Sequence, residues 1–255
     1  MKFARFMTSN NEITRFAVLE QGKLHEIEGD IYTDWKKNGN IHEERHVKLL
    51  APLIPNSIIG VGKNYVAAGE AKPNQDQPIP VLFYKPVSSM IGPEDQIFMP
   101  AGLKGIKFES ELAVVIGKKA SKITEEEALD YVFGYTIAND VTAPQYFHPD
   151  GHWMVGKSFD TFTPIGPYIE TELNLSTVSV QADHNGTLKQ DSPLDLMILK
   201  IPYLISYLSS VMTLQPGDVF LSGSPAGAEF MAVGDTISCR IEGIGTLMNK
   251  VVAAK

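Results

Sequence analysis

The sequence predicts an α+β fold that is predominantly β, with a few short helices. Short β-rich runs recur along most of the chain, and most of them end at Gly, Pro, Asn or Asp: "SIIGVG", "VLFYKP", "ELAVVIG", "VFGYTIAN", "TVSVQAD", "DVFLSG" and "DTISCRIEG". Helical signals are fewer. At 255 residues the chain can form one large domain, or a full domain with a smaller partner.

The N-terminal part predicts a small β-meander. The runs "KFARFMT", "ITRFAVLE" and "LHEIEG" are separated by the turn signals "SNNE" and "QGK". A polar stretch that contains Trp35 follows, and "LAPLIPN" then carries two prolines. We therefore expect a domain boundary near Pro55, with a small N-terminal β domain over residues 1–55 and a larger domain over residues 56–255.

Two segments predict helices and a third predicts a hairpin. "TEEEALDYV" opens with Thr124 and has Glu127 three residues later, which is the capping-box pattern. "DLMILKIPYLISYLSSVM" has apolar residues at helical spacing, and Pro202 should kink the helix or restart it with proline in the first turn, so we expect two short helices. Asn185-Gly186 lies between strand-like flanks and favours a two-residue hairpin turn, because both residues tolerate positive φ.

Composition excludes several kinds of partner. The formal net charge is −8, so the basic footprint of a nucleic-acid binder is missing. No run of about 18 apolar residues occurs, and the N-terminus is interrupted by charge too early for a signal peptide. Cys239 is the single cysteine, which fits a reducing compartment. We expect a soluble, cytoplasmic protein with neither nucleic-acid nor membrane partners.

Two acids lie at the start of one predicted strand. In "KFESELAVVIG" Glu109 and Glu111 project to the same face, with Cα atoms about 6.5 to 7 Å apart. A solvated strand end is the ordinary explanation for such a pair. Asp140, however, ends the apolar run "FGYTIAND" and can supply a third carboxylate. Three converging carboxylates need a cation, and oxygen ligands favour Mg²⁺ or Mn²⁺, and allow Ca²⁺, over zinc.

Several segments match one family in order and spacing: "FESELAVVIG", "GYTIANDVTA", "GKSFDTFTPIGP", "LQPGDVFLSGSPAG" and "GDTISCRIEGIGTL". Over about residues 57–253 the chain resembles the fumarylacetoacetate hydrolase family. The resemblance implies a rolled, β-barrel-like mixed β-sheet for the catalytic domain, a small N-terminal β domain and a homodimer.

The resemblance also implies roles for individual residues. Glu109, Glu111 and Asp140 would bind Mg²⁺ or Mn²⁺, and Lys157 in "VGKSFDTF" would place a positive charge beside the bound oxyanion. The implied substrates are 2-oxo or β-diketo acids, dicarboxylic acids among them. A divalent ion polarises the carbonyl and stabilises the enolate that C–C bond hydrolysis, decarboxylation and keto-enol isomerisation share.

A glycine-rich segment is the candidate site for the substrate carboxylate. "SGSPAG" is similar to a family segment that uses backbone N–H groups and a hydroxyl for this purpose. Gly223 and Ser224 are therefore candidate substrate-binding residues, since serine keeps the hydroxyl. For Ser222 an ordinary Gly/Pro turn stays an alternative. Lys85, near the end of "VLFYKP", is a further substrate-binding candidate.

The chain departs from the family pattern in "NYVAAGEA". Hydrolase and decarboxylase members carry a His/Glu acid-base dyad here, whereas this chain has Ala68 and Ala71, which cannot move a proton. Glu70 is the remaining catalytic candidate, although it is one residue out of register, about 100° of rotation on a helix.

A second departure follows Asp140. Pro144 and Phe147 stand where the family commonly has arginine and glutamine. His148 and His152 lie nearby, but the Pro-Asp-Gly between them argues against a helical metal-binding pair. We expect loop histidines, and the alternative is that one of them replaces the missing base.

Two hypotheses follow. The first is a metal-dependent enzyme that acts on a 2-oxo acid, and the missing dyad counts most against hydrolysis because water must be activated. The second is a non-catalytic or regulatory protein that keeps metal and dicarboxylate binding.

Gly60-x-Gly62 also resembles the start of a nucleotide-binding motif. The further glycine and lysine spacing of such motifs does not follow it, so we do not expect a nucleotide site there.

Overall fold

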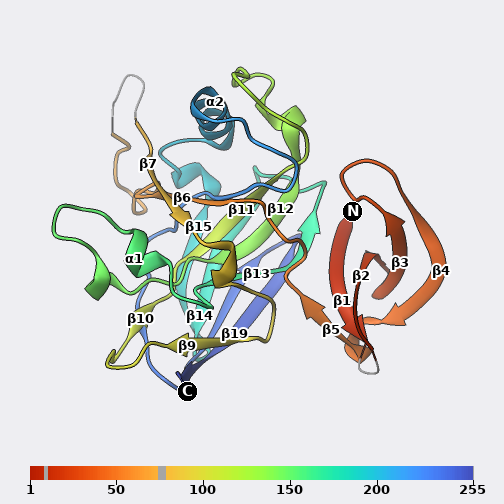
Figure 1. Cartoon of the computed structure of the whole chain (residues 1–255). Coiled ribbons are helices and arrows are strands. Elements are labelled where there is room, and N and C mark those ends of the chain that lie inside the picture. Colours follow the sequence, from red (N-terminus) through yellow and green to blue (C-terminus); the bar gives the residue numbers. More distant parts are fainter. Residues whose placement is uncertain (9–10, 74–78, 255) are drawn as a thin grey trace.

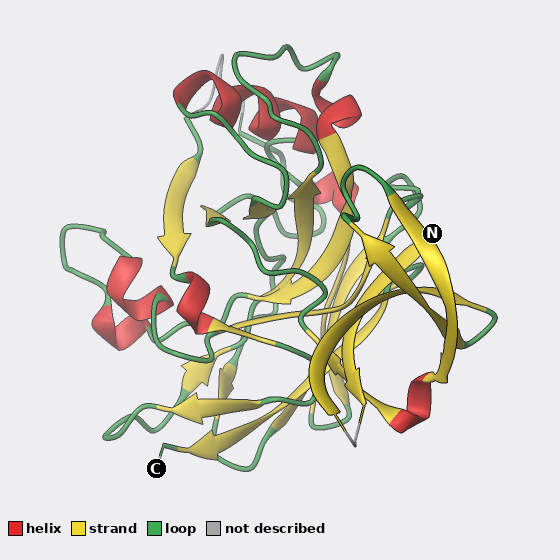
Figure 2. Cartoon of the chain, turned by 45° about the vertical axis from the view of Figure 1, so that its right-hand side comes forward, coloured by secondary structure: helices red, strands yellow, loops and turns green. Residues whose placement is uncertain are grey.

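The computed structural model describes residues 1–8, 11–73 and 79–254. In these ranges the strands form a twelve-stranded sheet, a five-stranded sheet and a two-stranded ribbon, while helices are few and short (Figure 2). The prediction of a predominantly β fold is confirmed. None of the helices in the same ranges has the length and apolar character needed to span a membrane.

The N-terminal strands form an antiparallel meander at one side of the molecule, red to orange in Figure 1. Its elements are β1 (Lys2–Thr8), β2 (Asn11–Glu20), β3 (Lys23–Gly29), β4 (Trp35–Glu43), the 3₁₀ turn η1 (Glu44–His46) and β5 (Val47–Leu50). The strands β1 to β4 pair in chain order, and β5 returns to pair with β1.

Two features of this meander differ from the sequence prediction. The polar stretch around Trp35 forms a strand, β4, which the sequence did not indicate because most of its side chains are exposed and no apolar alternation marks it. The turn predicted at residues 9–12 falls partly outside the described residues, and β2 begins at Asn11.

The rest of the large sheet contains β6 (Ile58–Gly62), β7 (Val81–Lys85), β8 (Met90–Ile91), β11 (Ser110–Ile116), β12 (Val132–Asn139), β13 (Thr163–Glu170) and β16 (Val219–Leu221). The main path runs β4-β3-β2-β1-β13-β12-β11-β16-β6-β7. The pairs β16–β6 and β13–β8 are parallel and the others antiparallel, so the predicted mixed sheet is confirmed. Among the described residues its ends do not pair with each other, so it does not close into a barrel.

Because β1 pairs with β13, the meander continues directly into this sheet. The domain boundary near Pro55 stays a prediction.

The smaller sheet has the order β15-β14-β18-β19-β9. It contains β9 (Gln96–Met99), β14 (Ser179–His184), β15 (Thr187–Pro193), β18 (Thr236–Ile241) and β19 (Gly245–Ala253), and the ribbon pairs β10 (Ile106–Lys107) with β17 (Phe230–Met231). The hairpin prediction is confirmed, since Asn185 and Gly186 join β14 to β15 with φ values of 52° and 82°.

The helical predictions are partly wrong. The helices are α1 (Met154–Lys157) and α2 (Ile201–Val211), with 3₁₀ turns η2 (Val87–Ser89), η3 (Ala128–Tyr131), η4 (Pro144–Tyr146) and η5 (Leu194–Leu196). Glu127 accepts from the Thr124 N–H at 3.1 Å, as in a capping box, but only the 3₁₀ turn η3 follows. Pro202 lies in the first turn of α2, so one helix and a 3₁₀ turn replace the two expected helices.

The strand β11, at whose start two of the acids lie, is buried on both faces. Leu112 and Val114 face the main core, which lies where β11, β12 and β13 pack on β14, β18 and β19. Ala113 and Val115 face a second core shared with the meander. This alternation fixes the register of the strand and therefore the direction of the acids at its start.

Candidate metal centre

Three carboxylates meet where β11 begins and β12 ends. Glu109 precedes β11, Glu111 lies within it, and Asp140 follows β12. Ser110 pairs with Asn139, which places the acids of the two strands side by side. The Asp140 N–H donates to the Glu109 carbonyl at 2.8 Å, and the Glu109 N–H donates to Asn139 Oδ1 at 3.0 Å. One carboxylate oxygen from each acid lies within 4.8 Å of the others.

Two lysines neutralise much of this charge. Lys157 Nζ lies 2.6 Å from Glu109 Oε2 and 2.5 Å from Asp140 Oδ2. Lys85 Nζ lies 2.6 Å from Asp140 Oδ1 and donates to the carbonyls of Lys157 and Val141 at 2.8 and 3.3 Å. We call these five side chains, Glu109, Glu111, Asp140, Lys85 and Lys157, the charged cluster.

Burial and charge act differently on the members of the charged cluster. Burial raises the pKa of Glu111 well above its usual range, and Asp140 adds to the rise. Burial also raises the pKa of Glu109, although Lys157 opposes it. For Asp140 burial is outweighed by Lys157 and Lys85, which hold its pKa below the ordinary value. Burial lowers the pKa of Lys85, whereas for Lys157 it is outweighed by Asp140 and Glu109, which raise the pKa.

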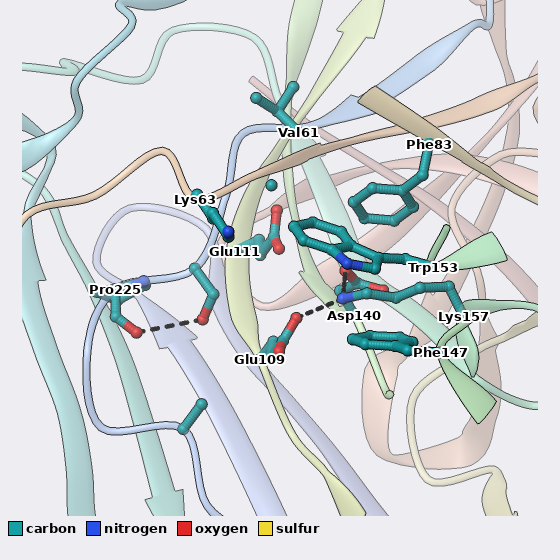
Figure 3. Close-up of a pocket in the computed structure, with 13 residues that line it drawn as sticks. Val61, Lys63, Phe83, Glu109, Glu111, Asp140, Phe147, Trp153, Lys157 and Pro225 are labelled. Atoms are coloured by element: carbon teal, nitrogen blue, oxygen red, sulfur yellow. Dashed lines mark hydrogen bonds and ion pairs between the residues drawn. The ribbon is translucent and has the colours of Figure 1, made fainter. Parts of the chain in front are cut away.

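The charged cluster opens into a cavity of about 230 Å³ (Figure 3). Its wall is aromatic: Trp153 stacks on Phe147 at 5.7 Å between ring centroids and meets Phe83 edge-on at 6.0 Å. Lys157 Nζ lies 4.8 Å from the centroid of the Phe83 ring. Trp153 and Lys157 are four residues apart at the two ends of α1, so both can face the cavity. One face of the cavity is therefore ionic and another apolar.

Two glycines of β6 make room for this aromatic wall. A Cβ on Gly60 would lie 2.1 Å from Cζ of Phe83, and a Cβ on Gly62 would lie 2.1 Å from Cζ3 of Trp153. Close side-chain packing against the strand thus explains the Gly60-x-Gly62 pattern.

The glycine-rich segment after β16 lies against the acids. The Gly223 N–H donates to Glu111 Oε2 at 2.6 Å, so it orients a carboxylate of the chain itself. Ser224 lines the cavity, and its hydroxyl accepts from Gln190 Nε2 at 2.8 Å. Ser222 is buried, and its hydroxyl has no hydrogen-bond partner among the described residues.

Several candidates from the sequence lie elsewhere. Lys85 is fully buried behind Asp140 and does not line the cavity. Glu70 is exposed and accepts from the Ala67 N–H at 3.1 Å, away from the cavity. His148 and His152 are exposed loop residues, as predicted, and the His148 N–H donates to the His152 carbonyl at 2.9 Å.

The sequence analysis missed other residues that build the site. Asn64 holds two loops together: its amide donates to the carbonyls of Leu199 and Ser222 at 3.0 and 2.8 Å. Gln190 accepts from the Ser110 N–H at 3.0 Å and so ties the glycine-rich segment to β11. Lys63 and Trp153 line the cavity. Glycines at alternate positions of β6 were the one available signal, since they mark a close approach by large neighbours.

The donors present fit a divalent cation. All three are carboxylate oxygens, the ligands that Mg²⁺, Mn²⁺ and Ca²⁺ prefer, and no histidine or cysteine joins them within the described ranges. Their mutual distance of at most 4.8 Å is close to the separation of two oxygen ligands on opposite sides of one hard divalent ion.

Comparisons with known proteins point to one family and one fold. Residues 57–252 match the family described as fumarylacetoacetate (FAA) hydrolase C-terminal, and residues 1–52 match Rv2993c-like, N-terminal. The crystal structure of 2-hydroxyhepta-2,4-diene-1,7-dioate isomerase from Mycobacterium marinum has a TM-score of 0.91 at 36% identity, covering 99% of this chain and 98% of that one.

Two further relatives are informative. Mitochondrial oxaloacetate tautomerase of Xenopus laevis is 39% identical over 231 residues, covering 84% of this chain and 72% of that protein. Maleylpyruvate hydrolase from Sphingobium sp. SYK-6, solved in complex with manganese(II) ion and pyruvate, has a TM-score of 0.82 at 28% identity over the whole of both chains. The chain belongs to the fumarylacetoacetate hydrolase family.

Proposed function

We propose that this protein is a divalent-metal-dependent enzyme that acts on a 2-oxo or β-diketo acid through an enolate. The observation that carries the proposal is the convergence of Glu109, Glu111 and Asp140 within 4.8 Å at a cavity with one apolar face. The relatives named above act, by their names, on organic acids of this kind, and one was solved with manganese(II) and pyruvate.

The same three acids would hold Mg²⁺ or Mn²⁺, with Ca²⁺ as a third candidate. The bound ion would supply a Lewis acid that polarises the 2-oxo group and stabilises the negative charge of the enolate.

The protein's own groups would complete this environment. Lys157 Nζ is the ammonium of the charged cluster that also lines the cavity, so it is placed to donate a hydrogen bond to an anionic substrate oxygen. Lys85 would act by holding Asp140 and the carbonyl of Lys157 in position. The rings of Phe83, Phe147 and Trp153 would exclude water beside the reacting carbon, which strengthens electrostatic interactions there.

Three reactions proceed through such an enolate: C–C bond hydrolysis, decarboxylation and keto-enol isomerisation. Of these, isomerisation and decarboxylation fit the cavity best. Ala68 and Ala71 are exposed and carry no group that moves a proton, and Glu70 lies away from the cavity. Among the described residues, the titratable groups that line the cavity are the three acids, Lys63 and Lys157. Hydrolysis demands an activated water and therefore a dedicated general base, whereas enolisation depends more on stabilisation of the oxyanion.

The second candidate function is a non-catalytic protein that binds a metal ion and a dicarboxylate. Ala68 and Ala71 favour it, because the acids and Lys157 are present in the cavity whereas the expected acid-base dyad is absent.

The test is turnover of oxaloacetate and of acylpyruvates by purified protein with Mg²⁺ or Mn²⁺, followed by enol absorbance. Lys157→Ala and Glu109→Gln should each lower turnover at least about 100-fold, as expected for loss of a charged group at a reacting oxyanion. Turnover that survives both substitutions contradicts the proposed site. No turnover together with metal-dependent oxalate binding favours the non-catalytic function. A homodimer and a cytoplasmic location stay predictions.

A further inference from the structure

Lys63 stands apart from the other lysines of the site. It directly follows β6, lines the cavity and is exposed. Its φ of 55° is the left-handed conformation that few residues other than glycine and asparagine adopt. Figure 3 shows Lys63 and Lys157 reaching the cavity from opposite sides, with Trp153 between them in this view.

The ammonium of Lys63 has no acidic partner among the residues that the structure describes. Within residues 1–8, 11–73 and 79–254, no carboxylate oxygen lies within 4.0 Å of Lys63 Nζ. Lys63 Nζ lies over the face of Trp153, 5.7 Å from the ring centroid. By contrast, Lys85 and Lys157 are both held by acids at 2.5 to 2.6 Å. Of the two lysines that line the cavity in the described part of the chain, Lys63 is thus the one that no described carboxylate pairs with.

The position of this charge suits the far end of a substrate. Glu109, Glu111 and Asp140 supply carboxylates that can hold a cation in this cavity, and Trp153 adds a flat apolar surface beside Lys63, with its ring centroid 5.7 Å from Lys63 Nζ. Lysine binds anions as a point charge on a flexible stem, so it can follow ligands of slightly different length.

We infer that Lys63 binds the distal carboxylate of a 2-oxo dicarboxylic acid, and that it thereby selects diacids over monoacids. The inference rests on the proposed function, because the 2-oxo carboxylate end would be held at the three acids. Lys63 is a specificity residue in this scheme and takes no part in proton transfer.

The test is calorimetric binding at saturating Mn²⁺ of pairs matched in chain length: oxaloacetate against 2-oxobutyrate, and 2-oxoglutarate against 2-oxovalerate. The wild type should bind at least one diacid about tenfold more tightly than its matched monoacid, the scale of one charge-assisted hydrogen bond. Lys63→Met should remove that preference while leaving the monoacid affinity within about twofold, and Lys63→Arg should retain the preference.

Lys122→Met is the matched control. Lys122 is exposed, has a φ of 56° and does not line the cavity, so the same substitution is made in the same backbone conformation. This variant should bind all four ligands as the wild type does.

Each other outcome overturns the inference in a recognisable way. Equal loss of monoacid and diacid affinity in Lys63→Met assigns Lys63 a structural role, and the melting temperature of the variant checks this. Absence of a diacid preference in the wild type rejects Lys63 as a specificity residue while leaving the proposed function intact. Failure of all four ligands to bind wild-type protein in Mn²⁺ rejects the proposed function and the inference together.

Discussion

The charged cluster and the residue 66–73 segment both lie beside the glycine-rich segment 222–227, which contacts Glu111 through Gly223 and shares a pocket with Ala68 through Ala226, yet they are built in opposite ways. In the charged cluster Asp140 is held by two lysines at 2.5 and 2.6 Å, and Glu111 accepts from the Gly223 N–H at 2.6 Å. In the 66–73 segment the side chains from Ala68 onward are exposed, and the hydrogen bond of Glu70 is local.

This difference in burial and pairing corresponds to two parts of the proposed chemistry, the holding of a cation or oxyanion and the transfer of protons. Groups that hold a cation or an oxyanion need fixed positions, which buried strands and paired charges provide. Groups that shuttle protons need reach and a suitable side chain, and the 66–73 segment presents alanine at both expected positions. In the proposed function the charged cluster therefore supplies the metal and oxyanion part of the chemistry, while the segment would supply proton transfer and has no side chain for it at Ala68 and Ala71.

The largest expected effect tests how strongly the charged cluster depends on its central acid. Asp140→Asn leaves the ammonium groups of Lys85 and Lys157 buried without their shared partner, so the free energy of unfolding should fall by about 3 to 5 kcal/mol. Urea unfolding with a chelator present measures it. Because pairing lowers the folded-state pKa of Asp140, this stabilisation is present above its ordinary pKa of about 3.9 and is lost as the pH falls through the folded value.

Asp195→Asn is the control for that experiment. The Asp195 side chain is 92% exposed and lies 3.4 Å from Lys200, so its replacement should change the unfolding free energy by less than about 0.5 kcal/mol. Equal effects of the two substitutions would contradict the contrast between buried and exposed charge.

The second prediction changes the segment instead. Ala68→His combined with Ala71→Glu supplies an acid-base pair where the chain has none, and it should raise acylpyruvate hydrolysis at least about tenfold, below the usual contribution of a fully positioned general base. Product formation is measured beside each single variant. No gain, with metal binding intact, would show that the segment does not limit the reaction.

The third prediction concerns Glu111, whose pKa is raised in the folded protein whereas that of Asp140 is lowered. Burial raises the folded-state pKa of Glu111, so its ionised form disfavours folding above that pKa, and the penalty disappears as the pH falls and the group takes up a proton. Glu111→Gln keeps an oxygen that can accept from the Gly223 N–H at 2.6 Å. In chelator at about pH 8 the free energy of unfolding of the variant should exceed that of the wild type. The difference should be larger than the roughly 0.5 kcal/mol typical of surface substitutions.

The difference should shrink toward acid pH, and chemical unfolding across a pH series measures it. A Glu111→Gln variant that is less stable than the wild type at neutral pH would be the opposite result.

The smallest effect is expected at Glu70. Because Glu70 is exposed and bonds only to the nearby Ala67 N–H, Glu70→Ala should leave turnover within about twofold and stability within about 0.5 kcal/mol. Steady-state kinetics and thermal unfolding check both values. A large loss of turnover would restore Glu70 as a catalytic acid or base.

Strong local patterns allowed much of the fold to be predicted. The run "VFGYTIAN" coincides with β12, and the acids at the mouths of β11 and β12 meet because those strands pair in the register that places Ser110 opposite Asn139. β4 escaped prediction because its exposed side chains give no alternation, and η3 stayed a short turn despite its capping contact.

The rest of the site depends on tertiary packing. Nothing local in the sequence indicates that Gln190 reaches Ser224 and Pro225, or that Lys85 lies behind Asp140. These contacts join residues that are 34 to 55 positions apart in the chain, and strand order rather than local sequence brings them together.

The most direct measurement is calorimetric titration of metal-free protein with Mn²⁺. The wild type should bind one ion per chain with a rise in melting temperature, since an ion that binds only the folded state stabilises it. Glu111→Gln should bind Mn²⁺ at least about tenfold more weakly although its metal-free fold is intact. Wild-type protein that binds no Mn²⁺, or a Glu111→Gln variant that binds it equally well, would contradict the assignment of Glu109, Glu111 and Asp140 as a metal centre.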